Sequence, residues 1–111
     1  MSIKKYETLT SIYAGEIAEI KRLQAIADGD LVAAQDAGKD TEDEYEAFIQ
    51  GQQAYRAYEA SSYAVNMAAE KLLTDIEAEY ANVPFESARK AGIEKFYEMA
   101  FDDNRLRMSR S

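Results

Sequence analysis

Residues 41–83 form a long stretch in which only one residue, Gly51, disfavours a helix. The single proline of the chain, Pro84, follows this stretch directly. As one α-helix the stretch would measure roughly 60 Å, because each residue adds about 1.5 Å. A compact domain of this chain length is only about 35 Å across. Either the helix is continuous and partner helices cover its excess length, or it breaks near residues 59–62, where Ser62 could cap a new helix.

Apolar residues at steps of three and four predict one further helix on each side of this stretch. The first covers residues 2–28 and the last covers residues 84–101. We therefore predict an all-α fold, an antiparallel bundle of three helices with a long second helix. If the long helix breaks near residues 59–62, the bundle has four helices.

Capping and breaking residues suggest where these helices begin and end. Gly29 fits the stop of the first helix, and Gly38 would end two further helical turns around residues 31–34. Thr41 and Glu44 fit a capping box at the start of the long helix, in which each side chain satisfies the other end of the turn, with Asp40 as a competing cap one residue earlier. Pro84 suits the first position of the last helix, with Asn82 as its cap.

The charge balance limits the partners that this chain can have. It carries 21 acidic and 13 basic residues, a formal net charge of −8. Nucleic-acid-binding proteins usually present a basic face, and anionic membranes attract basic segments, so we expect neither as a partner. No stretch resembles a signal peptide or a membrane span. We expect a cytoplasmic protein with one helical domain, residues 1–104, and a short, flexible, basic tail, residues 105–111.

Missing residue types exclude much catalytic and metal chemistry. The chain has no His, Cys or Trp, which removes thiolate and imidazole ligands, disulfides and His-based proton transfer. Glu16 and Glu19 have the spacing of carboxylate metal sites in helical bundles, but those sites pair Glu with His. The acidic residues between Asp28 and Asp40 fit an EF-hand loop in neither register. We expect no enzyme activity, no metal and no cofactor.

Tyrosines and small residues concentrate at the centre of the long helical stretch. The chain has eight tyrosines, and tyrosine is enriched in interfaces because it combines a large apolar area with a polar tip. This pattern predicts a non-catalytic interaction or assembly module that self-associates, with a homodimer as the first expectation. Alternatively, the tyrosines fill the edge of an ordinary bundle core. The predicted interface consists of Ala47, Gly51, Ala54, Tyr55, Tyr58 and Tyr63.

The charge distribution supports a second hypothesis. Residues 28–59 contain nine acidic and two basic residues and so carry −7 of the net −8. Such a face could block a nucleic-acid-binding or effector protein with a basic surface, as small acidic inhibitors of phages do, and a viral protein of this kind would act in the host cytoplasm. Acidic residues also simply complement the dipole at a helix N-terminus. The acidic face consists of Asp36, Asp40, Glu42, Asp43, Glu44 and Glu46.

The tail is the one segment with a basic character. Its positive charges are Arg105, Arg107 and Arg110. They could anchor the chain to an acidic partner, or they could offset the negative end of the last helix.

Overall fold

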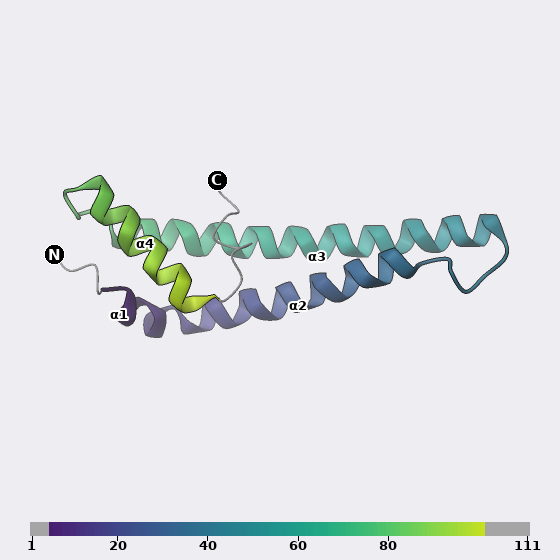
Figure 1. Ribbon diagram of the computed structural model, residues 1–111, viewed down its shortest axis with the longest axis horizontal. Helices are drawn as coiled ribbons and strands as arrows, with labels where there is room; N and C mark the ends of the chain where they lie inside the picture. Colours follow the sequence, from purple (N-terminus) through teal and green to yellow (C-terminus); the bar gives the residue numbers. More distant parts are fainter. Residues whose placement is uncertain (1–4, 102–111) are drawn as a thin grey trace. The chain divides into compact units, whose positions relative to one another are not determined.

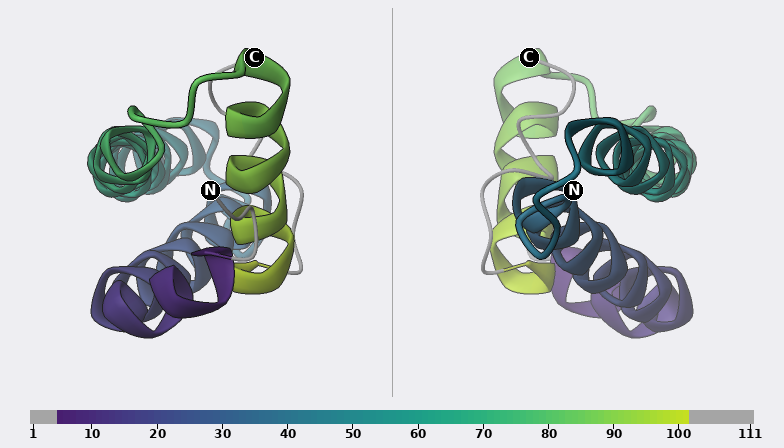
Figure 2. Two further views of the ribbon diagram at one scale, coloured as in Figure 1. Left: turned by 90° about the vertical axis from the view of Figure 1, so that its left-hand side faces the viewer. Right: turned by 90° about the vertical axis from the view of Figure 1, so that its right-hand side faces the viewer.

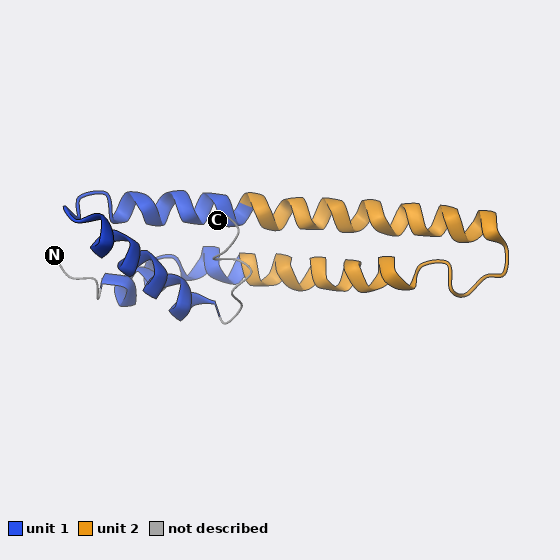
Figure 3. Ribbon diagram, turned by 45° about the horizontal axis from the view of Figure 1, so that its top comes forward, with its two compact units in different colours: residues 1–19, 68–111 blue, residues 20–67 orange. Residues whose placement is uncertain are grey.

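The computed structural model describes residues 5–101, which form helices and no strand. The helices are α1 (Lys5–Ile12), α2 (Ala14–Asp36), α3 (Glu44–Glu79) and α4 (Glu86–Ala100) (Figure 1). Helix α4 packs across α1 (Figure 2). The prediction of an all-α fold is confirmed. The chain forms two compact units: unit 1 from residues 1–19 and 68–111, and unit 2 from residues 20–67 (Figure 3).

Helix α3 is one uninterrupted helix of 36 residues, so no break occurs at residues 59–62. The described residues still form four helices, because the N-terminal segment divides at Tyr13. The Tyr13 N–H donates to the carbonyl of Leu9 at 2.9 Å, and its own carbonyl accepts from the N–H of Ile17 at 3.0 Å. Both bonds have helical spacing, so the division at Tyr13 is a local distortion of the helix and not a loop.

Two glycines that look alike in the sequence have different roles. The prediction that Gly29 stops a helix is wrong, since α2 continues through it to Asp36. Gly29 is exposed, and a glycine in a helix costs only about 1 kcal/mol relative to alanine. Gly38 has a φ of 83°, a left-handed conformation that glycine adopts without steric cost. The turn after α2 therefore depends on Gly38.

Helix α3 begins two residues later than the capping box at Thr41 predicts. Its cap is Asp43, whose Oδ1 accepts from the N–H of Tyr45 at 2.9 Å and from the N–H of Glu46 at 3.3 Å. The Thr41 hydroxyl instead accepts from the N–H of Asp43 at 3.2 Å and so shapes the turn before the helix.

The predicted start of the last helix at Pro84, with Asn82 as cap, is also wrong. Helix α4 begins at Glu86, and Phe85 precedes it without a side-chain cap. The guanidinium of Arg89 donates to the carbonyl of Val83 at 2.7 Å. This bond holds the turn before the helix, a role that a local capping residue would otherwise have.

The core of unit 1 forms where α4 meets Tyr80, the residue directly after α3. Tyr80 and Phe96 are fully buried there, together with Leu9 of α1. A Cβ added to Gly92 would overlap the ring of Tyr80, because it would lie only 2.7 Å from the Cζ atom of Tyr80. The absence of a side chain at Gly92 is therefore what lets α4 approach Tyr80 so closely.

We expect Gly92→Ala to destabilise the protein, because the new methyl group enters the space of a buried ring. Overpacking of this kind typically costs about 1–3 kcal/mol of unfolding free energy. The matched control is Gly29→Ala, where nothing lies within 4 Å of the added Cβ; it should gain up to about 1 kcal/mol. Urea denaturation of both variants measures the difference, and equal effects would contradict this account of Gly92.

The hydroxyl of Tyr80 generates a second prediction. It is buried and has no hydrogen-bond partner among the described residues. A buried polar group without a partner costs about 1–3 kcal/mol, so Tyr80→Phe should raise the free energy of unfolding by about 1 kcal/mol. If urea denaturation instead showed that Tyr80→Phe lowers the free energy of unfolding by a similar amount, the hydroxyl would have to be hydrogen-bonded in the folded protein.

Candidate functional site

Unit 2 has almost no interior of its own. It pairs residues 20–36 of α2 with residues 44–67 of α3, which run antiparallel (Figure 3). Its buried apolar residues are Ile20, Ala27 and Val65. None of residues 28–64, all of which are described, is buried. Two helices can shield only one strip of each other, so much of their surface stays exposed.

Large exposed side chains lie on one side of α3 throughout unit 2, at steps of three and four residues. Such spacing places them on a single face of the helix. The five apolar members are between 55% and 72% exposed. Single exposed apolar residues are ordinary on protein surfaces, but a contiguous set marks an interaction site. We call this surface the outer face; it consists of Tyr45, Phe48, Gln52, Tyr55, Arg56, Glu59, Tyr63 and Met67.

An open groove of about 400 Å³ lies in the N-terminal part of the outer face. Aromatic rings, an amide and two opposite charges line it, so it offers both apolar and polar contacts. Tyr63 and Met67 continue the outer face beyond the groove and do not line it. The lining residues are Phe48, Gly51, Gln52, Tyr55, Arg56 and Glu59.

The structure divides the interface predicted from sequence between two sides of α3. Tyr55 and Tyr63 are exposed on the outer face. Ala47, Ala54 and Tyr58 are half-buried on the other side. Gly51 is also half-buried, but it lines the groove and so lies at the border between the two sides. The rings of Tyr55 and Tyr58 meet at a centroid distance of 6.3 Å, so the two sides touch at this pair.

Sequence reasoning missed three apolar members of the outer face, Tyr45, Phe48 and Met67. A signal was available, because the steps of three and four that connect them with Tyr55 and Tyr63 are visible in the sequence. Small residues and tyrosines do not follow that period by themselves, so the predicted interface combines residues from both sides of the helix.

All six residues of the predicted acidic face are exposed, and half of them have structural roles. Asp36 forms an ion pair with Lys39 at 2.9 Å. Asp43 caps α3, and a carboxylate oxygen of Glu46 accepts from the amide of Gln50 at 3.1 Å. The members without a partner among the described residues are Asp40, Glu42 and Glu44. The basic residues Arg105, Arg107 and Arg110 lie outside the described part of the chain.

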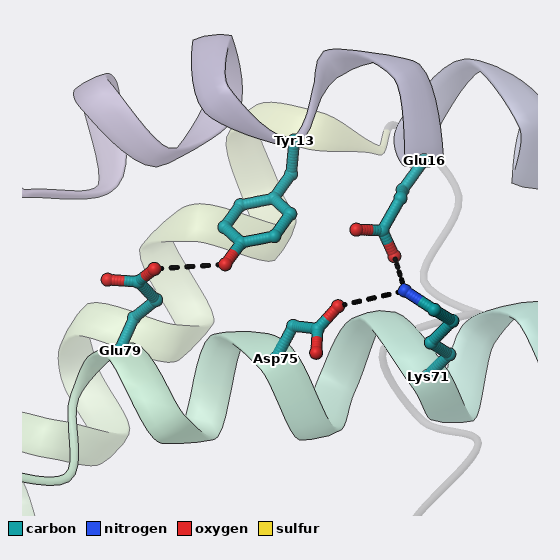
Figure 4. Close-up of polar contacts among 5 residues, drawn as sticks. All are labelled: Tyr13, Glu16, Lys71, Asp75 and Glu79. Atoms are coloured by element: carbon teal, nitrogen blue, oxygen red, sulfur yellow. Dashed lines mark hydrogen bonds and ion pairs between the residues drawn. The ribbon is translucent and has the colours of Figure 1, made fainter.

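A polar cluster in unit 1 connects α3 with the N-terminal helices (Figure 4). The Tyr13 hydroxyl donates to a carboxylate oxygen of Glu79 at 2.9 Å. Lys71 Nζ donates to Asp75 at 3.2 Å and to Glu16 at 3.4 Å. The hydrogen bond to Glu79 raises the pKa of Tyr13, and those to Asp75 and Glu16 raise the pKa of Lys71. Both groups therefore stay protonated at neutral pH, and neither can serve there as a general base.

Comparisons with protein-family models, curated proteins and solved structures find no match to this chain. Within residues 5–101, no three acidic side chains are grouped so that they could hold a metal ion. No helix in the described part of the chain has both the length and the apolar character needed to cross a membrane. Geometry alone therefore supports the outer face as a candidate site.

The polar cluster predicts a pH dependence of stability. The pKa of Tyr13 is raised from 10.0, mainly by the hydrogen bond to Glu79. The folded state thus holds this proton more tightly than the unfolded state. Its stabilising contribution is complete below pH 10 and is lost as the pH rises through the higher folded-state pKa. In Tyr13→Phe, urea denaturation should show a shallower loss of stability above about pH 10.

The same variant should lose about 1 kcal/mol of unfolding free energy at pH 7, since one hydrogen bond is removed. The control is Tyr45→Phe, which removes an exposed hydroxyl that has no hydrogen bond in the described part of the chain. Equal slopes above pH 10 in the two variants would refute the role given to the Tyr13–Glu79 bond.

Proposed function

We propose that this protein is a non-catalytic interaction module that self-associates through the outer face of α3. One observation carries the proposal: five large apolar side chains share one exposed face in the unit that has almost no interior. Covering this face would provide the burial that the two helices of unit 2 do not provide for each other. Apolar burial stabilises by about 25 cal/mol per Å².

The composition of the outer face also supports an interface. Aromatic residues, Met and Arg are enriched in protein interfaces, and Lys and Asp are depleted there. The outer face contains four aromatic rings, Met67 and Arg56, and neither Lys nor Asp. Its one acidic residue is Glu59.

A second candidate function is the inhibition of a basic protein through the acidic face. The observation that favours it is the exposure of Asp40, Glu42 and Glu44, which have no partner among the described residues. Such a complex would weaken strongly at about 1 M salt, where the screening length falls to about 3 Å. A complex through the outer face would persist, because apolar burial does not depend on charge.

Solution mass tests the proposal. We expect size exclusion with light scattering to give a species of at least twice the 12.5 kDa chain mass, at both low and high salt. Phe48→Glu should shift this species toward the monomer, because it places a charge in the groove, with the circular dichroism of the helices unchanged. The matched control is Phe85→Glu, since Phe85 is 69% exposed in unit 1 and Phe48 is 59% exposed.

A monomer at every concentration and salt level would contradict the proposal and leave the acidic face as the candidate site. An equal loss of mass in both variants would show that assembly does not use the outer face.

A further inference from the structure

We infer that the outer face binds the outer face of a second copy in antiparallel orientation, with Arg56 of each copy paired with Glu59 of the other. This inference rests on the proposed function and adds the partner, the orientation and the register. The two-fold axis then passes between residues 57 and 58 of both helices. Homodimers with such an axis are the commonest symmetric assemblies, and each uses the same surface twice.

The spacing of the outer face supports this register. From Phe48 the face continues through Gln52, Arg56, Glu59 and Tyr63 to Met67, in steps of four, four, three, four and four. This series of steps reads the same in both directions. An antiparallel copy therefore places a side chain opposite each of these positions.

The resulting pairs are chemically complementary. Phe48 lies opposite Met67 of the second copy, and a thioether against an aromatic ring is favourable. Gln52 lies opposite Tyr63 of the second copy, where an amide can bond a hydroxyl. The groove between Phe48 and Glu59 thus receives Tyr63 and Met67 of the second copy, neither of which lines the groove of its own copy.

The charges favour the antiparallel orientation over the parallel one. Arg56 and Glu59 are the two charged residues of the outer face, and neither has an ion-pair partner among the described residues. In a parallel pair each would face its own copy, and like charges in an interface cost several kcal/mol. In the antiparallel register the same two residues form two ion pairs, one on each side of the axis.

The available area matches what a small dimer needs. A fully exposed aromatic side chain offers about 150–250 Å², so rings that are a little over half exposed provide on the order of 100 Å² each. The four rings, Met67 and the stems of the polar residues together approach the roughly 800 Å² per partner of a standard interface. A second copy is thus sufficient to cover the outer face.

Charge reversal tests the pairing. Arg56→Glu and Glu59→Arg should each raise the dimer dissociation constant on the order of ten-fold or more, because each places four like charges at the axis. An equimolar mixture of the two variants should restore the wild-type constant, since every Arg then faces a Glu. Lys90→Glu makes the same charge change as Arg56→Glu, but on α4, and should leave the constant unchanged. A mixture that binds no better than the single variants would overturn the register.

Cysteine crosslinking tests the orientation directly, because the chain has no cysteine of its own. A mixture of Gln52→Cys and Tyr63→Cys should form a disulfide-linked dimer under mild oxidation. Neither variant alone should do so, since residue 52 and its copy are offset by about 16 Å along the helices. Disulfides need Cα atoms within about 7 Å.

The outcomes separate this inference from the proposed function. Crosslinks in each variant alone would show a parallel pair, which overturns the orientation while self-association through the outer face stands. A dimer that forms no crosslink in any combination would overturn the register in the same way. A wild-type protein that stays monomeric would overturn both.

Discussion

Two helices cannot enclose a core, and the surface of this protein follows from that constraint. In unit 2, α2 and α3 shield one strip of each other, and no other described residue of that unit covers the opposite side of α3. Unit 1 adds α1 and α4, and there Tyr80 and Phe96 are fully buried. At the same steps beyond Met67, α3 continues with the exposed polar residues Glu70 and Thr74. The exposed apolar side chains of α3 thus lie in the unit that lacks a core. This coincidence is the reason to regard the outer face as an interaction surface.

The sequence allows the helices to be predicted but not all of their ends. Residues without a breaker favour a helix additively over many positions, so the continuous α3 is predictable. The position of a helix end depends on a single turn, and the path of the chain in three dimensions decides where that turn occurs. Gly29 and Gly38 are equally good stops by residue type, yet only Gly38 has a positive φ. Thr41 and Asp43 are both good caps, and the path of the loop assigns that role to Asp43.

The sequence predicts which segment of α3 carries the candidate site, but not which side of the helix is exposed. The concentration of tyrosines points to residues 45–63, because contiguous exposed apolar surface marks an interaction site. Which side of the helix faces α2 is a property of the packed pair. Small residues such as Ala47 and Ala54 are half-buried, and large ones such as Phe48 are exposed on the opposite side. A search by residue type joins the two sides, whereas a search by period separates them.

Two opposite charges at the centre of an apolar face limit how that face can associate. A uniform aromatic stripe could pair in many registers and with many partners, which leads to aggregation. Arg56 and Glu59 carry a desolvation cost in every arrangement that leaves either of them without an opposite charge. Arrangements that bring the two together offset part of this cost, and for two copies of one helix the antiparallel register does so twice. In the proposed dimer, the apolar side chains would set the affinity, and the charged pair would set the partner and its orientation.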